Sequence, residues 1–307
     1  MSVTLPVPRD YDLLLSVHSW IYPDVQPVPE VTKPGSYGRI LTVETVPCPV
    51  VVKQSEPGGR LRVAYSSEIL NRREVKKEVR RILGLDIDTQ PALDRMAKDE
   101  ILSPIVSRVR GIRPYVSDTP FEALIKTMVQ QQISYRAANV ITKRLVLGLG
   151  ATDPSLNELL YGFPRESSLI TCGVDGLRAF GLGYKAECVY NVCCLVADGG
   201  LDLSRLVEMS YEEILGILGS IRGVGEWTVQ TFMIAVLGDV NIFPFGDLGA
   251  RNFLGHVYNA GNRMNTNQVV ELSNAFGPQG PLILYLLMCA DVLGLVEKTG
   301  SPKTHKR

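Results

Sequence analysis

The first 68 residues differ from the rest of the chain in how their apolar positions are spaced. Short runs rich in β-branched residues alternate there with turns that contain glycine and proline, whereas helical spacing dominates afterwards. The pattern predicts an antiparallel sheet with one apolar face, and Pro47 and Pro49 are expected to separate its first two strands. The runs cover residues 39–46, 50–53 and 61–65, and the turns cover residues 35–38 and 57–59.

A helix is expected after the sheet, over residues 67–83. One of its faces is basic, and it is either a solvated surface or a contact for phosphate groups. The basic residues of this face are Arg72, Arg73, Lys76, Lys77, Arg80 and Arg81.

Helical patterns fill most of the remaining chain. They cover residues 119–149, 153–191, 211–257 and 267–296, and Asp153-Pro154 is expected to start the second of them. The predicted fold class is therefore α+β. Its domains are a sheet plus helix at 1–85, a helical body at 86–297 and a basic flexible tail at 298–307.

Composition narrows the class of protein without naming a function. The 307 residues are 45% hydrophobic and 21% charged, which is ordinary for a soluble globular protein. No apolar run of about eighteen residues predicts a membrane span, and the N-terminus does not resemble a signal peptide. A cytoplasmic, nucleoid-associated protein without a membrane partner is expected. The six cysteines and three histidines show no metal-site spacing.

The net charge is zero, but charge is unevenly distributed along the chain. Residues 101–150 hold seven Lys/Arg against two acids, and residues 187–250 hold nine acids against two arginines. A nucleic-acid contact in the acidic segment would therefore depend on backbone amides, with residues 101–150 supplying the positive charge.

Two helices are expected at residues 211–218 and 226–236, joined by Ile221-Arg222-Gly223-Val224-Gly225. The glycines allow positive φ and close approach of another backbone. The free amides at the start of the second helix would form an anion site that suits a DNA phosphate. The alternative is an ordinary helical hairpin.

An acidic residue, Asp247, follows this hairpin in the sequence. Asp247 ends the run Phe243-Pro244-Phe245-Gly246-Asp247, at the head of a helix that starts at Leu248. Taken alone, Asp247 is a helix cap. The helix N-terminus would also stabilise its negative charge, as a catalytic carboxylate requires.

The run LGSIRGVGEWTVQTFMIAVLGDVNIFPFGDLGAR resembles the signature of the helix-hairpin-helix DNA glycosylase superfamily, and most closely its 3-methyladenine DNA glycosylase II type. The resemblance implies an N-terminal sheet domain and a helical body of two lobes. It implies hydrolysis of the bond between deoxyribose and a damaged, alkylated purine that has been flipped out of duplex DNA. The expected partner is double-stranded DNA, and a monomer is expected.

The resemblance assigns roles to individual residues. Asp247 falls on the catalytic carboxylate, which would stabilise positive charge on the sugar. The base pocket falls on Trp227, Phe121, Thr231 and Leu248, where Trp227 is either a pocket wall or a core aromatic. Because Thr231 and Leu248 stand where aromatics are expected, the pocket is less aromatic than in the bacterial pattern.

Three further assignments follow from the same resemblance. FEALIKTMVQQQIS matches the segment whose wedge residue fills the gap left by the flipped base, and the wedge falls on Gln132; the alternative is a plain polar helix end. Phosphate contacts fall on Gly223, Gly225 and Thr228. No cofactor is required, but main-chain oxygens could hold Na+ or K+ at the hairpin. These oxygens belong to Gly219, Ile221 and Val224.

Related enzymes that also cleave the strand carry a lysine where Trp227 stands, and that lysine forms a Schiff base with the sugar. No lysine occurs between Lys185 and Lys298. The sequence therefore predicts a monofunctional enzyme that leaves an abasic site. One alternative is the same chemistry on another lesion: hypoxanthine, 8-oxoguanine or uracil. The other is a DNA-binding module without catalysis, but such a module would have no use for a carboxylate near the phosphates.

Overall fold

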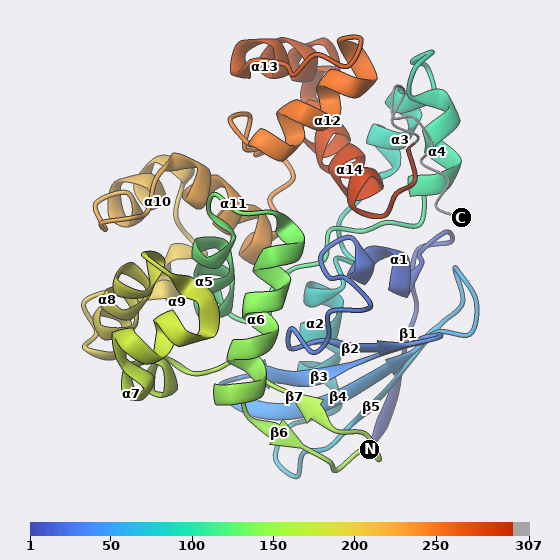
Figure 1. Ribbon diagram of the computed structural model, residues 1–307. Helices are drawn as coiled ribbons and strands as arrows, with labels where there is room; N and C mark the ends of the chain where they lie inside the picture. Colours follow the sequence, from blue (N-terminus) through green and yellow to red (C-terminus); the bar gives the residue numbers. More distant parts are fainter. Residues whose placement is uncertain (297–307) are drawn as a thin grey trace, which may run out of the picture.

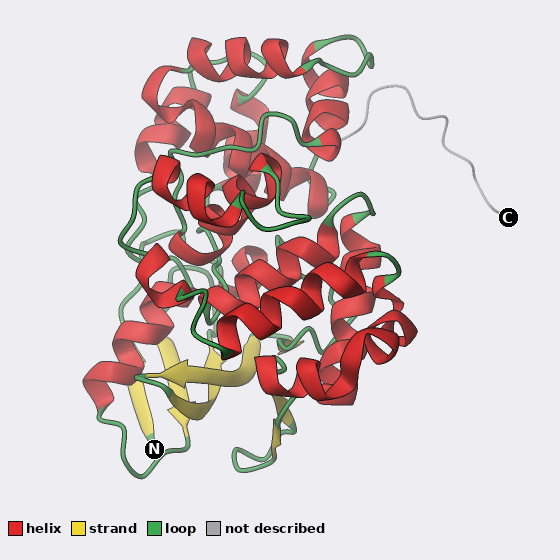
Figure 2. Ribbon diagram, turned by 90° about the vertical axis from the view of Figure 1, so that its left-hand side faces the viewer, coloured by secondary structure: helices red, strands yellow, loops and turns green. Residues whose placement is uncertain are grey.

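The structure is a computed structural model that describes residues 1–296. The predicted basic tail at 298–307 lies outside the described residues. The N-terminal part forms a five-stranded antiparallel sheet in the order β1-β5-β4-β3-β2, which lies below the helices in Figure 1 and is drawn yellow in Figure 2. Its strands are β1 (Ser2–Leu5), β2 (Val31–Lys33), β3 (Ser36–Val43), β4 (Val46–Lys53) and β5 (Leu61–Tyr65).

The two central strands, β3 and β4, form a hairpin that differs from the predicted pattern. Glu44 and Thr45 form its turn with φ of 46° and 71°, as a two-residue hairpin turn requires. The predicted break at Pro47 and Pro49 is wrong, because β4 runs through both. A proline lacks the N–H that would bond to a neighbouring strand, but β4 pairs with β5 only from Val50 onward, so neither proline interrupts that pairing.

Two helices pack with the sheet. α1 (Leu13–His18) was not predicted, and α2 (Arg72–Ile82) lies within the predicted helix. A capping box at Asn71 starts α2, and its apolar face enters the sheet's hydrophobic core through Val75 and Val79.

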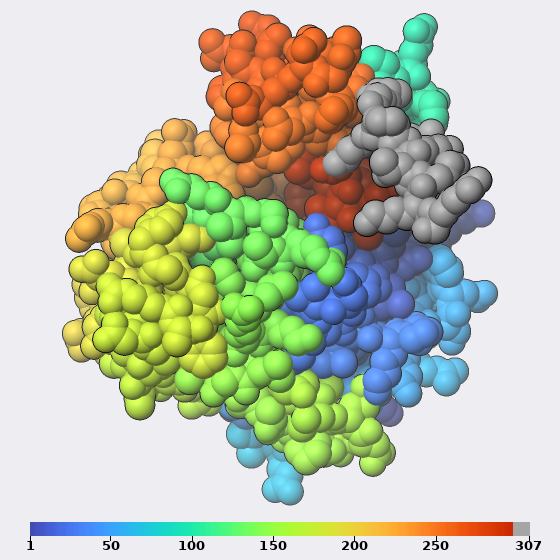
Figure 3. Space-filling view, in the orientation of Figure 1, coloured from blue at the N-terminus to red at the C-terminus, as the bar shows by residue number. Residues whose placement is uncertain are grey.

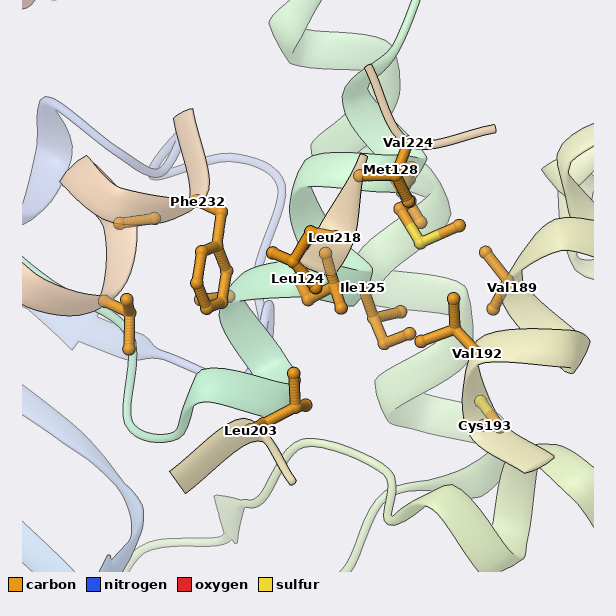
Figure 4. Close-up of a cluster of buried hydrophobic side chains, with 14 of the residues drawn as sticks. Leu124, Ile125, Met128, Val189, Val192, Cys193, Leu203, Leu218, Val224 and Phe232 are labelled. Carbon is orange, nitrogen blue, oxygen red and sulfur yellow. The ribbon is translucent and has the colours of Figure 1, made fainter. Parts of the chain in front are cut away.

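Helices α5 to α11 form a first helical lobe around one hydrophobic core. Figure 4 shows side chains of α5, α8, α10 and α11 meeting in that core, among them Ile125, Val192, Leu218 and Phe232. The helices are α5 (Pro120–Gln130), α6 (Tyr135–Leu149), α7 (Glu166–Leu177), η1 (Arg178–Leu182), α8 (Lys185–Ala197), α9 (Leu203–Leu206), α10 (Tyr211–Leu218) and α11 (Glu226–Leu237).

The helix start predicted at Asp153-Pro154 is wrong. β6 (Thr152–Asp153) pairs with β7 (Leu160–Tyr161) instead, and α7 begins only at Glu166. Leu160 is buried against Ile40 and Val51 of the sheet. This small strand pair therefore attaches the first lobe to the sheet.

A second helical lobe combines two distant parts of the chain around its own core. Helices α3 and α4 precede the first lobe in sequence, yet they pack with the C-terminal helices at the top of Figure 1. The elements are α3 (Gln90–Met96), α4 (Ser103–Val109), α12 (Leu248–Tyr258), α13 (Thr266–Ala275), η2 (Gly277–Gln279) and α14 (Gly280–Val292).

Two features join the three cores. Trp20 packs against all of them, and its Nε1 donates to the Tyr285 hydroxyl at 2.7 Å. The fully buried Arg39 of β3 pairs with Glu30 at 2.9 Å and with Glu122 of α5 at 2.5 Å. Because a buried charge is costly without its partner, these ion pairs fix how the sheet meets the first lobe.

Candidate active site between the two helical lobes

The hairpin predicted from the sequence is present between α10 and α11. Gly223 has a φ of 88°, and its backbone lies so close to α8 that an added Cβ would be 2.7 Å from Cys188 Sγ. Val224 is buried in the first lobe's core, whereas Gly223 and Gly225 are exposed. Glycine is thus required at 223 by both φ and space, and the tip of the turn faces solvent.

The open amides at this tip fit the predicted phosphate contact at Gly223 and Gly225. Gly225 precedes α11 without a side-chain cap, so the first turn of the helix keeps amides for an outside acceptor. Thr228 is different. Its side chain is 2% exposed and its hydroxyl accepts from Gln131 Nε2 at 2.9 Å, so the structure gives it no open path to a phosphate.

Asp247 sits at the N-terminus of α12, at the end of the segment that leaves α11. Its Oδ1 accepts from the Ala250 amide at 2.7 Å, and its Oδ2 accepts from Trp227 Nε1 at 2.8 Å. The side chain is half-buried. The cap predicted from the sequence therefore exists, and the second oxygen is oriented by the first turn of α11.

This geometry holds a carboxylate in one orientation between the two lobes. Two N–H donors and the α12 N-terminus stabilise its negative charge, and each oxygen keeps a further lone pair for another partner. Figure 3 shows a hollow on this face of the molecule, with α14 at its bottom between α12–α13, α6 and the N-terminal segment. The chain from α11 to α12 passes beside it (Figure 1).

Three of the four predicted pocket residues lie together. Trp227 and Thr231 are one helical turn apart on α11, and Leu248 directly follows Asp247 with 54% of its surface exposed. Thr231 is only 7% exposed, and its hydroxyl has no hydrogen-bond partner within residues 1–296. An unpaired buried hydroxyl on α11 is unusual, because a buried polar group normally finds a partner.

Phe121 does not join this group. α5 and α11 run antiparallel, since the Ser117 amide donates to the Ala235 carbonyl at 2.7 Å while Gln131 reaches the start of α11. Phe121 starts α5 and therefore lies towards the far end of α11, where its ring meets that of Phe163 edge to face at 6.4 Å. The structure thus contradicts its place beside Trp227.

Other aromatic side chains gather where the cores meet, and sequence reasoning missed them. Tyr135 and Tyr285 flank Trp20, each with its ring centroid 6.4 Å from that of the indole. A cavity of about 30 Å³ lies beside this cluster, lined in part by Trp20, Gln130 and Tyr135. Trp20 is one of only two tryptophans in the chain, but the irregular segment around it provides no periodic signal.

The predicted wedge protrudes between α5 and α6. Gln132 is exposed and has a φ of 58°, a left-handed conformation that costs energy for a residue with a Cβ. Neighbouring contacts hold it there. Gln131 Nε2 donates to the Gly223 carbonyl at 2.7 Å, and Lys185 Nζ donates to the Val129 and Gln131 carbonyls at 2.6 Å each.

Lys185 is almost fully buried, and burial lowers its pKa. Its ammonium group caps the C-terminal end of α5, where carbonyl oxygens lack helical partners. The wedge segment is thus tied to α8 on one side and to the hairpin on the other.

The main-chain oxygens predicted to hold a monovalent cation fit that role in part. The Ile221 carbonyl already accepts from the Val224 amide at 3.0 Å and keeps one lone pair. In the described part of the chain, the carbonyls of Gly219 and Val224 accept no hydrogen bond. No group of three or more His, Cys, Asp or Glu side chains within residues 1–296 could hold a metal ion.

The positive excess predicted for residues 101–150 is only partly consumed within the protein. Lys126 pairs with Glu122, Arg136 pairs with Asp24, and Arg113 is 7% exposed. The other four basic residues are exposed or half-buried, namely Arg108, Arg110, Lys143 and Arg144.

The fold and the site define a helix-hairpin-helix protein with a carboxylate held between two helical lobes. A putative DNA-3-methyladenine glycosylase of Bacillus subtilis is 26% identical over 232 residues, which cover 75% of this chain and 79% of that protein. The solved 3-methyladenine DNA glycosylase from Archaeoglobus fulgidus has a TM-score of 0.84 at 26% identity, covering 94% of this chain and 98% of its own. In sequence and in fold, the chain is similar to the helix-hairpin-helix DNA glycosylases.

A third relative differs from these two because its name includes a DNA lyase activity. A probable N-glycosylase/DNA lyase of Methanothermobacter thermautotrophicus is 23% identical over 286 residues, covering 86% of this chain and 89% of that protein. No protein-family model matches the chain. Among the helices of residues 1–296, none has the length and apolar character needed to cross a membrane.

Proposed function

We propose that this protein is a monofunctional DNA glycosylase that hydrolyses the bond between deoxyribose and a flipped, alkylated purine in duplex DNA. The observation that carries the proposal is the Asp247 carboxylate, held by the Ala250 amide and by Trp227 Nε1. The similarity to a solved 3-methyladenine DNA glycosylase and to a putative DNA-3-methyladenine glycosylase supports the substrate class.

The chemistry follows from the charge that develops during the reaction. A purine alkylated at N3 or N7 is cationic and leaves as a neutral base with the bonding electron pair. Positive charge then builds on the deoxyribose, where a fixed carboxylate stabilises it and orients the attacking water. The water oxygen bonds to C1′, its proton is released, and an abasic site remains.

Trp227 supports this mechanism in two ways. Its N–H orients the Asp247 carboxylate, and its electron-rich ring would attract a cationic base by a cation–π contact. It also occupies the position at which a lysine would be needed for strand cleavage, and an indole forms no Schiff base with the sugar.

The hairpin and the α5–α6 connection would hold the DNA on either side of this reaction. The amides of Gly223 and Gly225 would bind a DNA phosphate, and Gln132 would fill the space left by the flipped base. The carbonyls of Gly219, Ile221 and Val224 would hold Na+ or K+, which would supply fixed positive charge beneath that phosphate. The hydrolysis at Asp247 would require no cofactor.

The test is single-turnover release of 7-methylguanine or 3-methyladenine from methylated duplex DNA by Asp247→Asn. We expect loss of release by at least about 100-fold, because the amide carries no charge to stabilise the transition state. Binding to a duplex with a tetrahydrofuran abasic analogue should be retained. The matched control is Asp239→Asn, which changes a half-buried acid in the same inter-helix segment and should release base like wild type.

Two outcomes would overturn parts of the proposal. Release by Asp247→Asn within about threefold of wild type would exclude Asp247 as the catalytic carboxylate, and no release by the wild type would leave a DNA-binding module. A covalent protein–DNA adduct trapped by borohydride would contradict the monofunctional assignment and favour the lyase activity named for the Methanothermobacter relative.

A further inference from the structure

The outer face of α2 carries four positive charges that have no acidic partner in the described part of the chain. They extend from the first two turns of the helix, and within residues 1–296 none of them makes an ion pair or a side-chain hydrogen bond. Three of these side chains are exposed and one, that of Lys76, is half-buried. This basic face of α2 consists of Arg72, Arg73, Lys76 and Lys77.

The acids of the helix are engaged elsewhere. Glu74 completes the capping box at the start of α2, and Glu78 pairs with Arg81 at 2.5 Å. Arg80 has an acidic partner of its own in Asp86, just after the helix. The basic face is therefore what remains after the helix has used its acids for capping and pairing.

The four charges weaken the helix that carries them. Arg72 and Lys76 are four residues apart, as are Arg73 and Lys77, so the members of each pair are neighbours on the helix surface. Like charges at this spacing repel each other and destabilise a helix. The opposite, apolar side of α2 packs into the sheet's core without their help. Packing does not explain the basic face, whereas a negatively charged partner would.

α2 meets the body of the protein at a distance from the candidate active site. Arg81, in its last turn, donates to the Val236 carbonyl at 3.4 Å, at the C-terminal end of α11. The hairpin and Trp227 belong to the other end of α11, and the helix axis rises roughly 14 Å between Trp227 and Val236. Nor is α2 a wall of the hollow in Figure 3. A duplex held beside Asp247 therefore meets the molecule at a different place from the basic face.

We propose that the basic face of α2 binds the phosphates of a second segment of duplex DNA. Long cationic side chains without an acidic partner are suited to phosphates, which supply most of the sequence-independent affinity of DNA-binding proteins. A protein partner would need an apolar centre in its interface. Between residues 66 and 85, Ile69 is the single large apolar side chain that is exposed, so the surface offers little of that kind.

The inference goes beyond the proposed function, because this contact needs neither Asp247 nor a damaged base. Phosphates carry no sequence information, so the contact would be the same on any duplex. A protein that holds one segment through α2 keeps its other DNA site at a high effective concentration of DNA. The basic face would thereby let the protein pass between neighbouring segments during a search for damage.

The test compares the wild type with a variant whose basic face is neutral. Glutamine resembles lysine and arginine in helix propensity, and it removes the like-charge repulsion. The variant should therefore unfold at no lower urea concentration than the wild type. This neutralised variant combines Arg72→Gln, Arg73→Gln, Lys76→Gln and Lys77→Gln.

A control variant changes the net charge by the same amount at scattered positions. Its four side chains are exposed and lie on the outer side of the sheet and on the second lobe. Loss of DNA binding in both variants to the same extent would show a general effect of charge and overturn the proposal. The control combines Lys53→Gln, Arg62→Gln, Lys98→Gln and Arg110→Gln.

The readout is the number of undamaged duplexes bound per protein, measured by analytical ultracentrifugation. Duplexes of about 12 base pairs are used in about 50 mM salt, where phosphate contacts are strong. We expect the wild type and the control to bind one duplex more than the neutralised variant. Four phosphate contacts imply that about 200 mM salt weakens the additional binding by roughly 100-fold.

Two results would refute the second-segment contact. Equal numbers of bound duplexes in the wild type and the neutralised variant would show that α2 binds no segment of its own. If only the salt dependence changed while the number of duplexes stayed the same, α2 would contact the duplex that the active site holds.

The two proposals fail in different ways. If the wild type releases no methylated base yet binds one duplex more than the neutralised variant, the basic face stands and the catalytic proposal falls. If base is released and the numbers of bound duplexes are equal, catalysis stands and the second contact falls. Single-turnover release from a short methylated duplex should be the same in the neutralised variant and the wild type, because α2 lies outside the active site.

Discussion

The hydrogen bond from Trp227 to Asp247 allows a quantitative test of the site. Trp227→Phe removes the indole N–H and retains an aromatic ring in the first turn of α11. Asp247 would keep its bond from the Ala250 amide, so the α12 cap should survive. Only the oxygen that faces α11 loses its donor at 2.8 Å.

The magnitude follows from the charge and exposure of the pair. A hydrogen bond to a charged group contributes about 1.5–3 kcal/mol, and the half-buried setting favours the lower end of that range. Released from Trp227, the carboxylate can also rotate away from the sugar, and small misplacements of a catalytic group are costly. We expect single-turnover base release to fall by about 10- to 100-fold.

The assay is base release with enzyme in excess over methylated duplex, together with binding to the tetrahydrofuran duplex. Binding should change by less than about threefold, because the hairpin amides are untouched. Tyr211→Phe is the matched control, since it removes a hydrogen bond of 3.0 Å to another carboxylate at the start of α11, that of Glu226. Release by Trp227→Phe at the wild-type rate would refute the view that the indole orients Asp247.

Two further predictions concern buried polar groups. Burial raises the pKa of Asp118 to about 6, so ionisation of this carboxyl destabilises the folded state. The unfolding free energy should therefore fall by about 2 kcal/mol between about pH 4.5 and about pH 7. Asp118→Asn should remove that decrease, as measured by urea titrations. A pH dependence that is identical in wild type and Asp118→Asn would contradict this. Thr231→Val replaces an unpaired buried hydroxyl by a methyl group and should raise the unfolding free energy by about 1 kcal/mol. A loss of stability in the same titration would show that the hydroxyl has a partner.

Much of the architecture could be predicted because it depends on local patterns. The sheet followed by helices, the hairpin and the Asp247 cap all arise from neighbouring residues: apolar periodicity, glycines at a turn and an acid before a helix. Where local rules compete, the prediction failed. Pro47 and Pro49 suggested a strand end, but β4 has no β5 partner beside them, so a missing N–H is tolerated there.

The sequence by itself determined that a carboxylate heads a helix after a glycine hairpin and that no lysine lies between Lys185 and Lys298. Only the tertiary structure decided what surrounds that carboxylate. The Trp227–Asp247 bond, the position of Phe121 towards the far end of α11, the burial of Thr228 and the Tyr184–Gln132 pair all depend on how helices distant in sequence pack. Helical periodicity shows which face of a helix is apolar, but the register and angle at which two helices meet depend on the fit of all their side chains.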